Sequence, residues 1–134
     1  MKGRVLAGGS ASAIAVVLRE PLSLWGGLDP GTGELIDAHH SQRGAQLAGR
    51  VLVMPAARGS SSSSSVLAEA ARAGNAPAAI LIGEPDLILA IGAAVADELY
   101  GERIPILVLA PGDLAAIRDG VRVSVAEDGE VTLG

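Results

Sequence analysis

The chain has 134 residues, of which 49% are hydrophobic and 19% are charged, and its net charge is −5. Because it contains no cysteine, it cannot form a disulfide, a zinc–thiolate site or a thiolate-held iron–sulfur cluster of its own. The acidic balance and the single Trp and Tyr argue against nucleic-acid binding, which relies on basic surfaces and aromatic stacking.

Mean hydropathy is +0.43, yet the longest apolar stretch, Leu87 to Ala96, is much shorter than the ~20 residues of a membrane span. Gly8 and Gly9 interrupt the apolar stretch near the start of the chain, so we expect no secretion signal. We therefore predict a soluble, cytoplasmic protein. With an aromatic content of 1%, its core must be built from Ala, Val, Leu and Ile.

The first part of the chain predicts three strands and a long loop. Two short β-prone runs, residues 5–7 and 14–18, flank the glycine pair. From Pro21 to Gly49 the periodicity disappears and Gly, Pro, Asp and His accumulate, which predicts a long loop with one short strand at residues 35–36. The apolar run at residues 50–54, closed by a proline, is typical of a central strand buried on both faces.

The middle of the chain predicts a parallel strand–helix–strand unit. After a run of serines, Val66, Leu67, Ala70 and Ala71 recur at helical spacing, and Gly74 follows where a helix would end. The apolar run at residues 78–82 predicts the next buried strand. Such a unit usually has a right-handed crossover.

The last part predicts a second helix, a strand and a hairpin. The helix covers residues 85–100, with Ile88, Ile91, Val95 and Leu99 along one face and a glycine at its end. Residues 106–109 predict a strand, residues 113–118 a helical turn, and residues 121–125 and 131–133 a hairpin around an Asp-Gly turn. The predicted class is α/β, with a mixed sheet or small barrel and two main helices.

The segment from Met54 to Leu67 carries six consecutive serines between a buried strand and a helix. A helix N-terminus offers free backbone N–H groups and partial positive charge, so such a loop can hold a carboxylate, a phosphate or an oxyanion. Gly59 would let the backbone approach a ligand closely. Alternatives are a flexible Gly/Ser linker and simple helix capping, but the flanks belong to one unit and capping needs only one or two serines.

Two enzyme classes fit the serine loop less well. The Gly-Lys-Ser/Thr ending of a nucleotide-binding loop is missing. A hydrolase triad would have to use His39 or His40, the only histidines, and the Gly-x-Ser-x-Gly elbow is absent. Trp25, followed by Gly26 and Gly27, either anchors a loop on an apolar surface or contacts a substrate or partner.

Several segments in order along the chain resemble the aconitase X swivel domain, or small subunit, family. The strongest likeness spans Gly49 to Pro55, Arg58-Gly59-Ser60 and Ser61 to Leu67. The other similar segments are Pro21 to Pro30, Thr32-Gly33, Ile36-Asp37, Ala76 to Ile80 and Ile91 to Ala94. The resemblance implies one swiveling β/β/α domain over residues 1–134, partnered with a large subunit that carries an iron–sulfur cluster.

The resemblance also implies chemistry. In the wider aconitase group a Gly-Ser-Ser loop supplies the serine that removes a proton from the substrate, and Ser60 falls on that position. The usual loop continues with arginine, whereas this chain continues with serines, so only Arg58 is available in its place. Besides Ser60 as the catalytic residue, the candidate substrate-binding residues are Arg58, Gly59, Ser61, Ser62, Trp25, Gly26, Gly27 and His39.

The family resemblance points to a hydro-lyase acting on a β-hydroxy carboxylate, either mevalonate 5-phosphate or cis-3-hydroxy-L-proline. We expect this chain to bind no metal and to need its large subunit for activity. One alternative is a non-catalytic module that binds small anions at the serine-rich helix N-terminus. Another is a structural adaptor that docks through an Ala-rich surface.

Overall fold

The structure is a computed structural model that describes all 134 residues. Its central feature is a seven-stranded sheet with strand order β1-β5-β4-β3-β2-β6-β7. Strands β2, β3, β4 and β5 run parallel, and β1, β6 and β7 are antiparallel to their neighbours. The mixed sheet confirms the predicted α/β class. The strands are β1 (Arg4–Ala7), β2 (Ala11–Val17), β3 (Val51–Met54), β4 (Ala79–Ile82), β5 (Ile106–Val108), β6 (Arg122–Val125) and β7 (Val131–Leu133).

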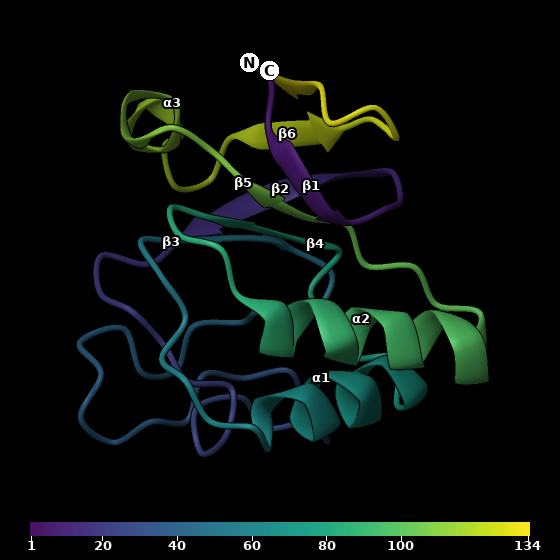
Figure 1. Cartoon of the computed structure of the whole chain (residues 1–134). Coiled ribbons are helices and arrows are strands. Elements are labelled where there is room, and N and C mark those ends of the chain that lie inside the picture. Colours follow the sequence, from purple (N-terminus) through teal and green to yellow (C-terminus); the bar gives the residue numbers. More distant parts are fainter.

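The sheet curls toward a half-barrel, because the residues beside its two edge strands meet. Lys2, just before β1, forms an antiparallel bridge with Glu130, just before β7. The Gly3 N–H also donates to the carbonyl of Gly129 at 2.8 Å. Gly129 has φ +91°, and a Cβ there would lie 2.7 Å from the Gly3 oxygen, so this contact requires glycine. The two chain ends consequently lie side by side (Figure 1).

Three helices flank the sheet: α1 (Ser63–Arg72), α2 (Leu87–Tyr100) and α3 (Pro111–Ala116). The first two lie side by side on one face, and α3 lies on the other (Figure 1). Helix α2 begins at Leu87 and not at Pro85, because Asp86 is extended and caps it by accepting the Leu89 N–H at 3.0 Å. The left-handed Gly101 ends it as predicted. None of these helices combines the length and apolar character needed to cross a membrane.

The central strands β3 and β4 are buried on both faces, as their sequences predict. Leu52 and Ile80 enter the core beneath α1 and α2, whereas Val53 and Leu81 enter the core inside the curled sheet. Both cores are aliphatic, since Trp25 is 61% exposed and neither core contains an aromatic side chain. The prediction of a core without aromatic residues is confirmed.

The apolar face used to predict α2 is not the face that packs. Ile91 and Leu99 are 57% and 64% exposed. The buried face consists of smaller residues together with one leucine, namely Leu89, Gly92, Ala93 and Ala96. The physical reason is the close approach of α1: a Cβ on Gly92 would lie 2.9 Å from the backbone oxygen of Ser64. Small residues permit this contact, and the larger apolar side chains point outward.

Candidate functional site

The serine loop, residues 55–62, connects the carboxyl end of the central strand β3 to the first residue of α1. Its path is fixed at the start by a hydrogen bond from the Gly83 N–H to the Pro55 carbonyl, 3.0 Å. At its end the Ser63 N–H donates to the Ser60 carbonyl at 2.9 Å, which forms a turn ahead of the helix. The loop is thus an ordered connection inside one strand–helix–strand unit, which argues against a linker between domains.

Three backbone N–H groups at this helix start are available to bind an anion. The amides of Ser61, Ser62 and Ser64 have no hydrogen-bond acceptor in the chain. The first turn of α1 contains no acidic residue, and Ser62 makes no side-chain capping bond. Free amides at the positive end of a helix attract carboxylate and phosphate oxygens. The hydroxyl of Ser60 likewise has no hydrogen-bond partner in the chain.

The Trp25 turn, residues 22–28, lies against the serine loop although the two are far apart in sequence. Its tight backbone depends on glycine: Gly26 has φ +76°, and a Cβ on Gly27 would lie 2.1 Å from the Ser23 carbonyl oxygen. The Trp25 N–H donates to the Ser63 hydroxyl at 3.2 Å. Because the Trp25 side chain is 61% exposed, it is not a buried anchor, and it remains available for contact with a ligand or partner.

A second contact joins the two segments at the start of the serine loop. Leu22 and Ala57 form a parallel bridge, and the Arg58 N–H donates to the Leu22 carbonyl at 3.1 Å. Residues 58–62 therefore arch between two points of attachment to the Trp25 turn. A Cβ on Gly59 would meet nothing within 4 Å, so the fold itself does not require glycine there. Its expected role in ligand approach stays a prediction.

Arg58 is exposed, and its guanidinium forms no ion pair within the chain. Its charge is still felt nearby. Hydrogen bonding from Ser41 lowers the pKa of the Glu20 carboxyl, and the positive charge of Arg58 adds to this effect. The Ser41 N–H lies 2.7 Å from that carboxylate. Arg58 thus remains free to pair with an anionic group brought to the serine loop.

The two histidines differ in environment. His40 is 7% exposed, and its Nδ1 accepts the Gln42 N–H at 3.0 Å. The proton of the neutral ring therefore lies on Nε2, which faces the Glu20 carbonyl at 3.3 Å. This pattern gives His40 a structural role in the long loop. His39 is exposed, its ring makes no hydrogen bond in the chain, and its expected contact with substrate stays a prediction.

Sequence reasoning missed Ser63, the one serine of the run that is buried, at 3% exposure. The helical periodicity of the sequence could have indicated that Ser63 is buried. Ser63 precedes the fully buried Leu67 by one turn, so both lie on the face of α1 that packs inward. The other serines lie off that face or ahead of the helix.

The residues of this chain do not fit an iron–sulfur cluster. There is no cysteine, and no group of three or more His, Cys, Asp or Glu side chains is placed to hold a metal ion. Fe–S clusters are held mainly by cysteine thiolates. A cluster in an enzyme built from this chain would have to be held by another subunit or domain.

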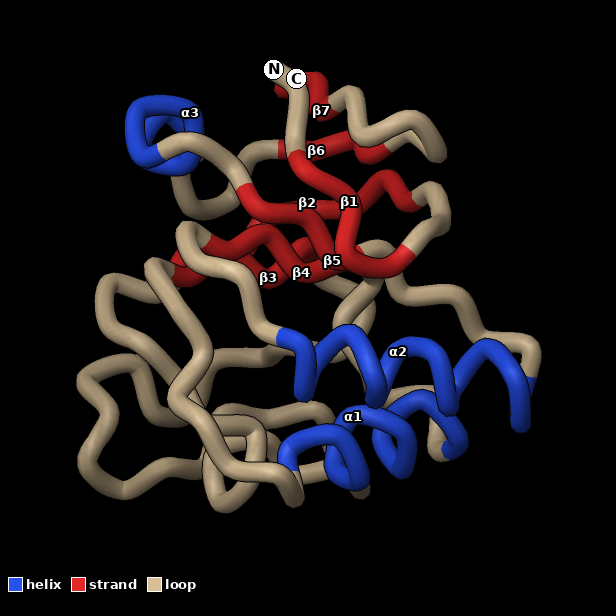
Figure 2. The backbone as a smooth tube through the Cα atoms, viewed as in Figure 1, coloured by secondary structure: helices blue, strands red, loops and turns tan.

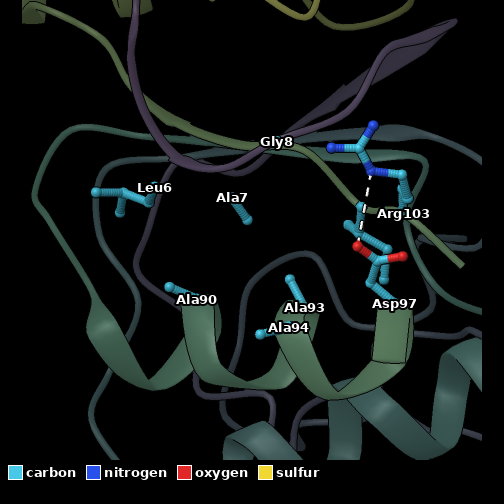
Figure 3. Close-up of a pocket in the computed structure, with 9 residues that line it drawn as sticks. Leu6, Ala7, Gly8, Ala90, Ala93, Ala94, Asp97 and Arg103 are labelled. Carbon is cyan, nitrogen blue, oxygen red and sulfur yellow. Dashed lines mark ion pairs between the residues drawn. The ribbon is translucent and has the colours of Figure 1, made fainter. Parts of the chain in front are cut away.

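Two hollows of the molecule adjoin the sheet. A groove of about 410 Å³ opens at the carboxyl ends of β2, β3 and β4, where Val17, Met54, Pro55 and Gly83 line it. Ligands of parallel sheets commonly bind at this edge. A smaller cavity of about 160 Å³ separates β1 from α2, with the Arg103–Asp97 ion pair of 3.8 Å at its side (Figure 3). No residue of the serine loop lines the smaller cavity.

The long loop also frames the site. It covers most of the stretch between β2 and β3 and lies beside the start of α1 (Figure 2). The predicted long loop is confirmed, but the short strand predicted at residues 35–36 does not form. Only isolated antiparallel bridges occur there, at Leu28–Leu35 and Glu34–Gln46.

Known proteins match this chain over nearly its whole length. A family model described as the aconitase X swivel domain matches residues 1–133. The phosphomevalonate dehydratase small subunit from Thermococcus kodakarensis is 37% identical over 131 residues, which are 97% of this chain and 98% of that subunit. The crystal structure of Thermococcus kodakaraensis aconitase X (holo-form) has a TM-score of 0.87 and 38% identity, and the match covers 99% of this chain and 96% of that chain.

A further relative is longer. Cis-3-hydroxy-L-proline dehydratase from Pseudomonas aeruginosa is 52% identical over 106 residues, which are 79% of this chain but only 18% of that enzyme. The relatives named here are thus dehydratases or their subunits. The match over residues 1–133, together with the same fold at 38% identity, confirms the family resemblance: the chain belongs to the aconitase X swivel-domain family.

Proposed function

We propose that this chain is the swivel-domain subunit of a hydro-lyase that dehydrates a small β-hydroxy carboxylate. In this proposal Ser60 is the catalytic residue, and a large aconitase X subunit supplies the rest of the active site and carries the iron–sulfur cluster. The observation that carries the proposal is the serine loop, where a hydroxyl without a partner lies next in sequence to free backbone amides at a helix start, those of Ser61, Ser62 and Ser64. The dehydratase names of the relatives support the reaction class.

The chemistry needs an anion site and a proton acceptor close together. Dehydration of a β-hydroxy acid removes a weakly acidic proton from the carbon next to the carboxylate and expels the hydroxyl from the following carbon. The free amides of Ser61, Ser62 and Ser64 are suited to hold an anionic group of the substrate, with the exposed Arg58 as a second cationic contact. Ser60 would then accept the proton.

A serine hydroxyl is a weak base in water, so its environment must favour the alkoxide. The positive end of the ten-residue helix α1 and the amides around Ser60 both stabilise negative charge at that place. Closure against a large subunit would exclude water and strengthen these interactions. Ser60 itself is only partly buried in this chain, which is consistent with a site that needs a second wall.

Two substrates remain in the proposal. The phosphomevalonate dehydratase small subunits match nearly the whole chain, whereas the hydroxyproline dehydratase has the higher identity of 52%. Both candidate substrates carry a hydroxyl one carbon beyond the α-carbon, and mevalonate 5-phosphate adds a second anionic group. The free amides of the serine loop can donate hydrogen bonds to a carboxylate or to a phosphate, so they are compatible with both substrates.

The test is reconstitution. The chain is co-expressed with a large aconitase X subunit from the same genome and purified without oxygen, and water loss is assayed on mevalonate 5-phosphate and cis-3-hydroxy-L-proline. We expect turnover of one of them only when both chains are present. A chain that binds phosphate or carboxylate alone, forms no complex and gives no turnover would replace the proposal with the anion-binding module.

A further inference from the structure

Ser63 is an unusual residue in this chain because it is both polar and buried. His40 and Ser63 are the only buried residues with polar side chains. A buried hydroxyl is retained at little cost only when it is hydrogen-bonded. The Ser63 hydroxyl accepts the Trp25 N–H at 3.2 Å and lies 3.5 Å from the Ser23 hydroxyl. Its partners therefore all belong to the Trp25 turn.

The backbone of Ser63 makes a second, different connection. Its N–H donates to the carbonyl of Ser60 at 2.9 Å. One residue thus holds the Ser60 carbonyl through its backbone and the Trp25 backbone through its side chain. The opposite end of the arch is attached to the same turn by the Arg58 N–H and the Leu22 carbonyl. No other serine of the run forms a hydrogen bond with the Trp25 turn.

We propose that Ser63 is a positioning residue, which fixes the place of Ser60 by coupling the serine loop to the Trp25 turn. This inference rests on the proposed function in so far as Ser60 is the catalytic residue. The coupling itself is a property of this chain and has its own readout. The exposed Trp25 side chain belongs to the same turn, so a ligand or partner that binds Trp25 and moves this turn would also shift the position of Ser60.

The geometry separates this role from simple helix stabilisation. Ser65 is exposed, belongs to the same first turn of α1 and makes no side-chain hydrogen bond. Replacement of Ser65 by alanine changes helix propensity and serine content in the same way as replacement of Ser63, but it leaves the contact with Trp25 intact. Ser65→Ala is therefore the matched control.

The experiment compares Ser63→Ala and Ser65→Ala in the full chain and in the assembled enzyme. In the chain, amide hydrogen exchange at Trp25 should be roughly tenfold faster for Ser63→Ala and unchanged for Ser65→Ala. Fluorescence of the single tryptophan, quenched by acrylamide, should report the same difference. In the assembled enzyme, kcat should fall by about 10²-fold for Ser63→Ala while KM changes little.

Ser63→Cys gives a second test that keeps the shape of the side chain, with one slightly larger atom, and weakens its hydrogen bonding. It should shift exchange and kcat in the same direction by a smaller factor, and it serves if the alanine variant does not fold. Unchanged exchange at Trp25, or faster exchange with wild-type kcat, overturns the proposal. If the wild-type complex shows no dehydratase activity, the proposed function fails, while the exchange data still decide whether Ser63 couples the two segments.

Discussion

Gly92 places α2 directly on the first turn of α1, and Gly92→Ala tests this contact. The added Cβ would lie 2.9 Å from the Ser64 oxygen, 3.0 Å from the Ser64 Cα and 3.2 Å from the Leu67 Cβ. The first two are backbone atoms, which cannot rotate away. In an open helix position the same change would stabilise the protein by up to about 1 kcal/mol. Overpacking against backbone costs about 1–3 kcal/mol, at the upper end where nothing yields.

The two effects combine to a predicted loss of about 2 kcal/mol in the free energy of unfolding, or a fall in Tm of roughly 6–8 °C for a chain of this size. Urea and thermal unfolding followed by circular dichroism would measure it. Gly112→Ala is the control, since Gly112 also lies in a helix and a Cβ there would meet nothing within 4 Å. A Gly92→Ala variant as stable as the wild type, or more stable, would refute the close contact between α1 and α2.

Two further predictions concern the core and the pH dependence of stability. Leu81→Ala removes a fully buried side chain from β4 and should lower the free energy of unfolding by about 2–5 kcal/mol. Leu99→Ala, at a 64% exposed position, should change it by less than about 0.5 kcal/mol. Comparable losses for the two variants in urea unfolding would contradict the assigned buried and exposed positions. Because the folded pKa of Glu20 is lowered from 4.5, its contribution is present above that pH and is lost as the pH falls through the folded value. Glu20→Gln should therefore lose less stability than the wild type between pH 6 and pH 3, with Glu34→Gln as control, and equal pH profiles would contradict it.

The sheet was predictable from sequence because its central strands are apolar without interruption. The apolar side chains of β3 and β4 point to both faces of the sheet, so both faces must be shielded from water, and in the structure both are. The hairpin followed from alternation around Asp128 and Gly129. The closure of the sheet edges through Lys2 and Glu130 was not predictable, since it depends on the twist accumulated over all seven strands.

The packing face of α2 shows where periodicity fails. The helix is apolar nearly all round, so its sequence contains two apolar stripes, and hydrophobicity alone predicts burial of the stripe with the larger side chains. Close packing against α1 selects the other stripe, in which Gly92 and Ala93 let the two backbones approach. The choice depends on the neighbouring helix and is not encoded within α2 alone.

The candidate site was predicted in part. The serine loop stood out by its place between a buried strand and a helix, and its free amides fit that prediction. Its contact with the Trp25 turn joins residues 38 positions apart, and no local pattern in the sequence indicates it. The selection of Ser63 among six serines follows from its place on the buried face of α1, which becomes visible once the helix start is known.

The central claim is that Ser60 accepts the proton from the carbon beside the substrate carboxylate. The most direct test follows loss of that hydrogen, with substrate deuterated at this carbon, in the reconstituted enzyme carrying Ser60→Ala or the control Ser65→Ala. We predict that Ser60→Ala forms the complex normally and slows hydrogen loss by about 10²–10⁴-fold, whereas Ser65→Ala keeps the wild-type rate. Hydrogen loss by Ser60→Ala at near the wild-type rate would contradict the assignment and remove Ser60 from the reaction.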